Sequence, residues 1–349
     1  MIKLSSLCCM AMLLNLAIDD PIDLCNEKLE HGRYVRFISD VIIDPNQADV
    51  IYAAEAFGVY KSIDGGATWK SAAGGLYETI SALAISTENS KIVFAVIDNR
   101  VSDNKIYRSD NGGDTWRSVF SVDLDDRGRN FYSEGMIFQN KNSIYAILGN
   151  NIYKSVDNGM EWAVFKKKCG SMASDIKNPK ILYAGCQVNS NDQNGIYKST
   201  DNGSTWSLVL YTTATITTLS VDNKNTQIIY AGTRAQGVFR SMDGGKQWHT
   251  LKDGLPPESI RALAIDSIHS NIIYVGTSNG VFKSTDSGLR WNKIGKGLPD
   301  YNNVNTLAID PQNTNILYIG TQFNGVFKSI DGGENWEPVN RGISCWQGY

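Results

Sequence analysis

The sequence predicts an all-β fold, a seven-bladed β-propeller of four-stranded antiparallel blades. A phrase of the form Ser-x-Asp-x-Gly-x-x-Trp recurs six times in full and once in a degenerate form along the 349 residues. The steps between its tryptophans are 47, 46, 44, 42, 43 and 45 residues (positions 69, 116, 162, 206, 248, 291 and 336). A fixed period of this length is typical of a propeller or an array, not of independent domains. No segment shows a sustained helical period, which favours strands between the phrases.

Each unit is expected to supply four short strands, and the sixth unit is the clearest. Its segments are Ile260–Asp266, Ile272–Thr277, Gly280–Ser284 and Arg290–Ile294. Such runs are β-branched or aromatic and are bounded by Gly, Asn, Asp and Pro, as strands should be. The first segment recurs at Ile38–Asp44, Ile80–Ser86, Tyr132–Phe138, Ser171–Lys177, Ile216–Asp222 and Val304–Asp310. The second recurs at Ile51–Ala54, Ile92–Val96, Ile144–Leu148, Ile181–Cys186, Ile228–Thr233 and Ile316–Thr321.

The repeated phrase is expected to form the turn between the third and fourth strands, called here the box turn. Ser and Asp side chains can bond to the backbone of the turn, and Gly adopts conformations that cost other residues more. The Trp can bury its ring between blades while its indole N–H bonds to a backbone carbonyl. In the degenerate copy, Asn111 holds the Asp position. The residues assigned this structural role are Ser62, Asp64, Gly66, Trp69, Trp116, Asp157, Trp162, Asp201, Trp206, Asp243, Trp248, Asp286, Trp291, Asp331 and Trp336.

The phrase is identified as the Asp-box, or BNR repeat, and the chain resembles Asp-box propellers over residues 38–343. Each box also follows an aromatic residue and a Lys or Arg, as in Tyr60-Lys61 and Phe282-Lys283. Proteins with such propellers include sialidases, xyloglucan-degrading endoglucanases, sortilin-type receptor ectodomains and photosystem II assembly factors. The resemblance implies the fold much more strongly than a function, because function depends on sites carried by the fold.

The N-terminus differs from the repeats. Lys3 is followed by an apolar run, Leu4–Ile18, and then by acidic residues. This pattern is typical of a secretory signal whose apolar part is too short to span a bilayer. We therefore divide the chain into a signal peptide (1–18), an N-terminal segment (19–37), the propeller (38–343) and a C-terminal tail (344–349). The protein is expected to be secreted, periplasmic or extracellular, with the cytoplasm as the alternative.

Four cysteines outside the leader suggest two disulfides in an exported protein. Cys169 precedes a predicted strand, and Cys186 ends the strand expected to pair with it. The two fall nearly opposite each other if the turn centres on residues 177–180. Cys25 and Cys345 flank the repeats, so a bridge between them would tie the two ends of the ring together.

Composition excludes some classes of partner. The net charge is −3 and no basic domain is present, which argues against nucleic acid as the main partner. The three histidines are far apart in the sequence, and no metal-ligand spacing occurs. We expect no metal, no cofactor, no transmembrane segment after removal of the signal, and a monomer.

Strand order divides the molecule into two faces. The box turns share one face with the turns between first and second strands; we call it the box face. The blade-to-blade connections and the loops between second and third strands lie on the other, the connector face. Three insertions fall on the connector face, where binding residues of loops are expected: Asp98–Lys105, Ser121–Glu134 and Gln187–Asn194.

The candidate site residues lie on this connector face. Carboxylates, guanidiniums and phenols there can recognise a polar ligand, and paired carboxylates can act on a glycosidic bond. The weak catalytic candidates are Asp123, Asp125 and Asp126. The ligand-binding candidates are Arg127, Arg129, Tyr132, Asp98, Arg100, Arg234 and Tyr301. Glu55, Phe57, Tyr77, Gln236 and Phe323 fall on the same face.

Two functions remain open. The first is a non-catalytic exported propeller that binds a protein or a glycan through the connector face. The alternative is a glycoside hydrolase, sialidase-like or endoglucanase-like. The first is favoured because the Arg-Ile-Pro motif of sialidases is absent: Arg36 is followed by Phe37-Ile38. The chain also has the length of one propeller, whereas the xyloglucan enzymes pair two.

Overall fold

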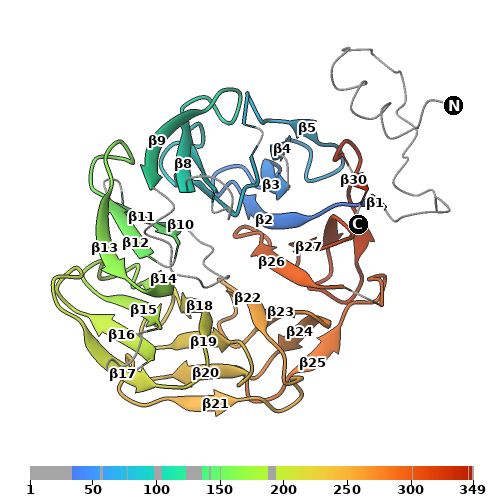
Figure 1. Cartoon of the computed structure of the whole chain (residues 1–349). Coiled ribbons are helices and arrows are strands. Elements are labelled where there is room, and N and C mark those ends of the chain that lie inside the picture. The colour runs from blue at the N-terminus through green and yellow to red at the C-terminus, as the bar shows by residue number, and fades with distance from the viewer. Residues whose placement is uncertain are drawn as a thin grey trace, which may run out of the picture.

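The computed structural model describes residues 34–55, 58–76, 78–97, 104–122, 136–140, 143–149, 151–187, 194–300, 302–344 and 346–347. Within these ranges the chain forms strands and no helix. Seven four-stranded antiparallel sheets follow one another around a central axis (Figure 1). The predicted seven-bladed β-propeller is thereby confirmed.

The innermost, first strands of the seven blades are β2 (Ile38–Ile43), β6 (Ala82–Ile85), β10 (Met136–Asn140), β14 (Cys169–Ser174), β18 (Ile216–Val221), β22 (Ile260–Ile265) and β26 (Val304–Ile309). The second strands are β3 (Ile51–Glu55), β7 (Val93–Ile97), β11 (Ser143–Leu148), β15 (Leu182–Cys186), β19 (Ile229–Thr233), β23 (Ile273–Thr277) and β27 (Leu317–Thr321).

The third strands are β4 (Gly58–Ser62), β8 (Asn104–Ser109), β12 (Asn151–Ser155), β16 (Gly195–Ser199), β20 (Val238–Ser241), β24 (Gly280–Ser284) and β28 (Val326–Ser329). The outer, fourth strands are β5 (Lys70–Ser71), β9 (Arg117–Val122), β13 (Ala163–Lys167), β17 (Ser207–Tyr211), β21 (His249–Leu251), β25 (Asn292–Ile294) and β29 (Glu337–Pro338). Two terminal strands, β1 (Tyr34–Val35) and β30 (Trp346–Gln347), pair with each other.

Every blade is a simple meander, as in the order β2-β3-β4-β5. Some bounds differ from the predicted ones. The first strand of the fourth blade begins at Cys169, two residues before the predicted start, and the outer strand of the sixth blade is Asn292–Ile294, shorter than the predicted Arg290–Ile294. A β-bulge lies between Cys169 and Ser171, so that the strand extends to Cys169, which pairs with Cys186.

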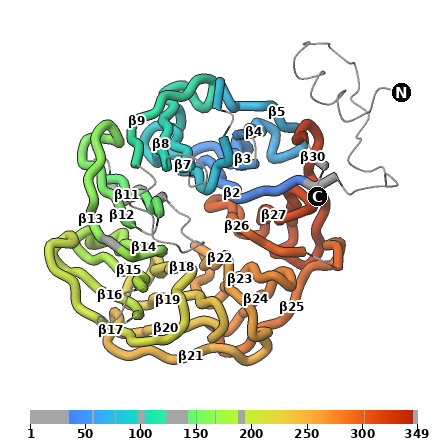
Figure 2. Tube along the Cα trace, in the orientation of Figure 1, coloured from blue at the N-terminus to red at the C-terminus, as the bar shows by residue number. Residues whose placement is uncertain are grey.

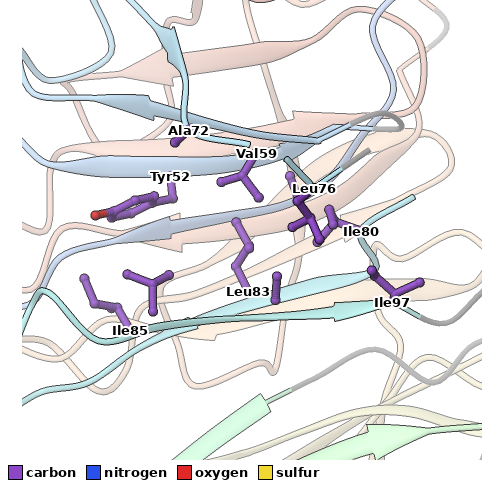
Figure 3. Close-up of a cluster of buried hydrophobic side chains, with 11 residues drawn as sticks. Tyr52, Val59, Ala72, Leu76, Ile80, Leu83, Ile85 and Ile97 are labelled. Carbon is purple, nitrogen blue, oxygen red and sulfur yellow. The ribbon is translucent and has the colours of Figure 1, made fainter. Parts of the chain in front are cut away.

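The core lies between blades. The second strands are buried along their whole length, as in Ile273–Thr277, except at Ser143 in the third blade, because both of their faces pack against other blades. Such a strand reads as an unbroken apolar run. Figure 3 shows one interface, where Tyr52 and Val59 of the first blade face Leu83 and Ile85 of the second. Seven interfaces of this kind distribute the hydrophobic stabilisation around the ring.

The box turn is built by its own side chains. In the first blade, the Ser62 hydroxyl donates to Asp64 Oδ1 (2.7 Å) and accepts the Gly66 N–H (2.9 Å). The same carboxylate oxygen accepts the N–H of Thr68 at 2.9 Å. Gly66 has a φ of 89°, and a Cβ there would lie 3.2 Å from the ring of Tyr318. Glycine is therefore required by both conformation and space.

The degenerate copy folds in the same way. Asn111 Oδ1 accepts from the hydroxyl of Ser109 and from the N–H of Thr115, both at 2.9 Å. An amide oxygen has the same acceptor geometry as a carboxylate oxygen, so the turn does not depend on the charge.

A latch joins each box turn to the preceding blade. Tyr52 Oη and Lys61 Nζ of the first blade both donate to the carbonyl of Gly112 in the second, each at 3.0 Å. Tyr318 and Lys328 of the last blade donate to Gly65 in the first, each at 2.8 Å. The basic residue before a box therefore serves the next box along the ring.

The ring closes with whole blades. Last and first blades lie side by side (Figure 2). Trp69 of the first blade donates its indole N–H to the Val339 carbonyl at 2.8 Å, and Asn305 Nδ2 donates to the Ile38 carbonyl at 2.9 Å. The pairing of β1 with β30 adds a short two-stranded sheet at the same joint.

Candidate functional site

Most predicted site residues lie outside the described part of the chain. These are the catalytic candidates Asp123, Asp125 and Asp126, together with Asp98, Arg100, Arg127, Arg129, Tyr132 and Tyr301. Their roles stay predictions.

Arg234 is the described member of the predicted set. It is exposed on the loop after β19, on the connector face, where its N–H donates to the Thr215 carbonyl at 3.0 Å. The neighbouring Gln236 side chain accepts a 2.9 Å hydrogen bond from the Thr212 hydroxyl. The loop is thus held against the connection that enters the fifth blade.

Hydrogen bonds assign the two faces independently of strand order. On the box face, the N–H of Gly65 donates to the Asp49 carbonyl (3.0 Å) and that of Gly332 to the Asn315 carbonyl (2.9 Å), which joins box turns to first-to-second turns. On the connector face, the N–H of Gln322 donates to the Asn303 carbonyl at 2.9 Å. The Ser and Asp side chains of the box turns form hydrogen bonds within the turns. The connector face is therefore the better candidate for a binding surface.

A cavity of about 910 Å³ occupies the centre of the ring and is walled by the first strands. Among the described residues of the wall, only Asp40 and Arg261 are charged. Both lie near the starts of their strands, and therefore toward the connector face. Pockets of this volume suit small ligands or chain ends rather than folded domains.

A belt of bulged residues lines this end of the channel. Five described first strands carry a register shift after their first residue, and the bulged positions are Ser39, Gly170, Thr217, Arg261 and Asn305. Three of the side chains donate to a main-chain carbonyl of the next blade. Ser39 bonds to Ile80 (2.6 Å), Thr217 to Ile260 (2.5 Å) and Asn305 to Ile38 (2.9 Å). The belt residues of the first, fifth and seventh blades thus have a structural role.

Asp40 ties three blades together. Its carboxylate accepts the Val41 N–H (2.9 Å), the Thr306 hydroxyl (2.8 Å) and the Leu83 N–H (2.9 Å). Burial raises the pKa of Asp40, and these three hydrogen bonds oppose that rise because they favour the ionised form. Both carboxylate oxygens of Asp40 thus accept hydrogen bonds from the wall itself.

Arg261 is less completely satisfied. Its Nη1 donates to Asn305 Oδ1 at 3.0 Å, while its enclosed Nε has no hydrogen-bond acceptor. It forms no ion pair with any residue that the structure describes. The wall therefore holds a guanidinium without a carboxylate partner, which is costly inside a protein unless another group neutralises it.

The surroundings of Arg261 are uncharged and polar. Ser259 and Gln322 line the cavity with it, and Asn303 Nδ2 donates to Gln322 Oε1. Beside Gln322, the Phe323 side chain is 45 % exposed on the connector face. Amides, hydroxyls and an open aromatic ring around one cation are suited to a polar ligand.

Neither Asp40 nor Arg261 was among the residues predicted from the sequence. A signal existed in the aligned units: Ala82, Ser171, Thr218, Ala262 and Thr306 stand where the first unit has Asp40. A charge that interrupts a repeat of small side chains marks a departure from the structural pattern.

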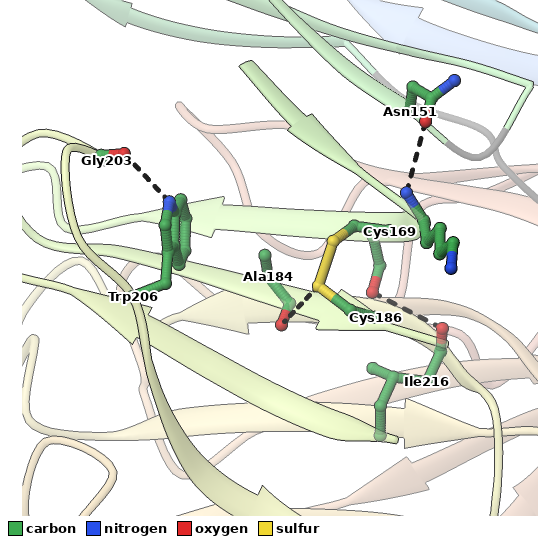
Figure 4. Close-up of a disulfide and its surroundings, with 9 residues drawn as sticks. Asn151, Cys169, Ala184, Cys186, Gly203, Trp206 and Ile216 are labelled. Atoms are coloured by element: carbon green, nitrogen blue, oxygen red, sulfur yellow. Dashed lines mark hydrogen bonds between the residues drawn. A yellow bond between two sulfur atoms is a disulfide. The ribbon is translucent and has the colours of Figure 1, made fainter. Parts of the chain in front are cut away.

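The fourth blade carries a disulfide between Cys169 and Cys186 (Figure 4), at the first position of the pair β14 and β15. In the sixth blade the same pair is Ile260 and Thr277, and Thr277 Oγ1 donates to the Gly280 carbonyl at 3.1 Å to close the loop. The disulfide thus takes the place of a loop-closing threonine. The second proposed pair, Cys25 and Cys345, lies outside the described residues.

The described residues contain neither a metal-binding cluster nor a membrane-spanning helix. No group of three or more His, Cys, Asp or Glu side chains is arranged to hold a metal ion. No helix in these ranges has the length and apolar character needed to cross a membrane.

The fold and its hydrogen bonds define the protein as a seven-bladed propeller in which a box turn joins the third and fourth strands of each blade. A family model described as "Sortilin, neurotensin receptor 3" matches residues 236–347. No curated protein matches the chain.

Several solved structures are similar in fold. The GH74 enzyme of Niastella koreensis superposes with a TM-score of 0.71 at 17 % identity, over 89 % of this chain and 55 % of that chain. YCF48 of Cyanidioschyzon merolae superposes with a TM-score of 0.62 at 14 % identity, over 86 % of this chain and 97 % of that chain. YCF48 has also been solved bound to D1 peptide, with a TM-score of 0.61 at 14 % identity over 85 % and 94 %.

An extracellular domain of a one component system from B. thetaiotaomicron gives a TM-score of 0.62 at 15 % identity, over 84 % of this chain and 38 % of that chain. The chain spans about half the length of the GH74 enzyme. At these identities the likeness shows the fold alone. The resemblance to sortilin-type, xyloglucanase-type and photosystem assembly propellers is confirmed at that level.

Proposed function

We propose that the protein is a non-catalytic, exported propeller that binds a protein or a glycan at the connector-face mouth of its central channel. The observation that carries this proposal is the unequal use of polar groups on the two faces. Box-turn side chains such as Ser62 and Asp64 form hydrogen bonds with each other and with the backbone of the turn. At the other end, Arg261 stands in the wall without an ion-pair partner among the described residues.

Two further observations support the proposal. Binding residues concentrate on loops held by a rigid scaffold. The belt and the latches supply such a scaffold beneath the exposed Arg234 and Phe323. YCF48, which has the same fold, binds a peptide, so a propeller of this size can act as a binding protein without a second domain. Export rests on the apolar leader Leu4–Ile18 and the four cysteines beyond it.

Labelled protein on glycan and peptide arrays tests the proposal. The connector-face variant Arg234→Ala/Phe323→Ala is compared with a box-face control, Ile63→Ser/Ile330→Ser, whose wild-type side chains are 69 % and 71 % exposed. We expect spots bound by the wild type to weaken in the first variant and to persist in the second. The reverse pattern would place the binding surface on the box face and refute the proposal.

Glycoside hydrolysis is the alternative. It needs two carboxyl groups about 5–10 Å apart across a cleft. The described wall contributes one carboxyl group, Asp40, which is engaged by three donors. A second would have to come from elsewhere, such as Asp125 or Asp126. Sugar release from sialosides, xyloglucan and other β-glucans, lost in an Asp125→Ala/Asp126→Ala variant, would establish the hydrolase instead.

A further inference from the structure

Among the five described belt positions, Arg261 is the charged residue and Gly170 is the one without a side chain. Serine or threonine at this position is long enough to reach the next blade, as Ser39 and Thr217 do. Asn305 reaches the next blade in the same way. Arg261 bonds instead to the side chain of Asn305. Its side chain is longer than such a contact requires, and it carries a charge that the contact does not need. The structural role of the belt therefore leaves the charge of Arg261 unexplained.

One hydrogen bond orients the guanidinium of Arg261. Arg261 Nη1 is fixed by Asn305 Oδ1, and Asn305 Nδ2 is in turn fixed by the Ile38 carbonyl. This chain of hydrogen bonds crosses from the sixth blade through the seventh to the first. A guanidinium oriented in this way presents its remaining N–H donors in a fixed plane, which matches the two oxygens of a carboxylate.

Negative charge nearby does not satisfy Arg261. Asp40 is the other charged side chain of the described wall, and its oxygens accept from Val41, Thr306 and Leu83. The cation is therefore available to an incoming anion, and partial exclusion of water from the channel strengthens their attraction.

The side chains around Arg261 indicate the class of ligand. Ser259, Gln322 and Asn303 offer hydroxyl and amide groups, and the described residues of the wall add no second cation for a polyanion. Phe323, 45 % exposed next to Gln322, offers an open ring face. One carboxylate with many hydroxyls describes a sugar acid better than it describes an acidic peptide, whose further charges would meet no second cation among the described residues of the cavity wall.

We propose that Arg261 binds the carboxylate of a hexuronate residue in an acidic saccharide, with Gln322 and Ser259 bonding to sugar hydroxyls at the connector-face mouth of the channel. This inference rests on the proposed function and assigns its ligand class. The cavity, about 910 Å³, is large enough for a short oligosaccharide to enter.

Calorimetric titration of the full chain with tetragalacturonate tests the inference, with neutral cellotetraose and tetraglutamate as comparison ligands. The variants are Arg261→Gln, which removes the charge, and Arg261→Lys, which keeps it. Arg290→Gln removes an exposed box-turn arginine and is the matched control. Melting temperatures check that each variant is folded.

We expect tetragalacturonate to bind the wild type and the Arg290 variant equally and more tightly than either comparison ligand. Loss of the charge-assisted hydrogen bonds should weaken binding by about 10- to 100-fold in Arg261→Gln. Arg261→Lys should lose less, and binding should weaken with added salt. If Arg261→Gln fails to fold, the comparison of the three ligands on the wild type still decides.

Absent binding of tetragalacturonate, equal binding of cellotetraose, or an unchanged Arg261→Gln variant would overturn the inference. Equal binding of tetraglutamate would overturn it in favour of an acidic peptide. The array experiment distinguishes failure of the uronate site from failure of the proposed function. A ligand found on the arrays that is lost in Arg234→Ala/Phe323→Ala but kept in Arg261→Gln would refute the uronate site and leave connector-face binding intact.

Discussion

Two tryptophans at the same position of neighbouring repeats differ in one hydrogen bond, which gives a sharp test of the box turn. Trp291 and Trp336 are each 3 % exposed. Trp336 donates its indole N–H to the Gly333 carbonyl at 2.8 Å. The indole N–H of Trp291 is enclosed and has no acceptor among the described residues. The two rings pack alike, over Gly288 and Gly333 respectively, with contacts to a built Cβ of 3.4 and 3.6 Å.

Replacement of each tryptophan by phenylalanine isolates that bond. Both changes remove a similar apolar area, so the packing loss largely cancels in the comparison. Trp336→Phe also loses a net hydrogen bond of about 1 kcal/mol, whereas Trp291→Phe removes a donor whose unsatisfied burial costs about 1–3 kcal/mol. The free energy of unfolding should therefore fall by about 2–4 kcal/mol more in Trp336→Phe than in Trp291→Phe. The alanine variants should each lose about 3–5 kcal/mol.

Urea denaturation followed by fluorescence and circular dichroism measures the difference. It is read as a free energy where the two signals give coincident transitions and as a shift of midpoint otherwise. Equal losses in the two phenylalanine variants, or a larger loss in Trp291→Phe, would refute the reasoning. Such a result would mean that the indole bond contributes nothing to the stability of the box turn.

Three further predictions follow from the same contacts. Side-chain and backbone hydrogen bonds from Asn335 lower the pKa of Asp331 to about 2, below the ordinary 3.8. The ionised carboxylate therefore stabilises the fold fully above about pH 4, and this stabilisation is lost as the pH falls toward 2. In Asp331→Asn, the melting temperature should therefore fall less steeply with decreasing pH in this range. Tyr318→Phe, at the joint of the ring, and Tyr52→Phe, inside it, each remove one latch bond and should each lower unfolding free energy by about 1 kcal/mol; a much larger loss at Tyr318 would show that the joint is a special weak point. Replacing Cys169 and Cys186 by alanine should cost about 3 kcal/mol for a closed loop of this size, and intact mass of the alkylated native protein should show both cysteines protected.

Sequence reasoning succeeded where the chemistry is local. The number of blades, the position of the box turns and the meander within each blade follow from residues at most one repeat apart. Asn111 in place of aspartate was read as a degenerate box, and its amide oxygen makes the bonds of the carboxylate. Strand ends were less accurate, because the bulge after Cys169 moves a pairing that the apolar pattern does not mark.

The sequence analysis did not identify Asp40 and Arg261 as site residues, for a physical reason, while most of the residues that it did name stay untested predictions. The prediction favoured charged insertions such as Asp123–Asp126, which the described residues do not include. Asp40 and Arg261 looked like ordinary strand positions, since the pattern of a first strand shows burial but not which neighbours a side chain meets. Their partners come from other blades, as when Thr306 donates to Asp40.

The sequence by itself determined the repeat, and with it the class of fold, since each box turn is closed by bonds within a few residues, as between Ser62 and Asp64. Only the tertiary structure decided how the ring closes and what its channel presents. Tyr318 meets Gly65, and Asn305 meets Ile38, only after seven blades have turned the chain through a full circle. The same closure places Arg261 in a shared wall without a carboxylate partner among the described residues, because contacts across the ring depend on the summed geometry of all the blades and not on any one repeat.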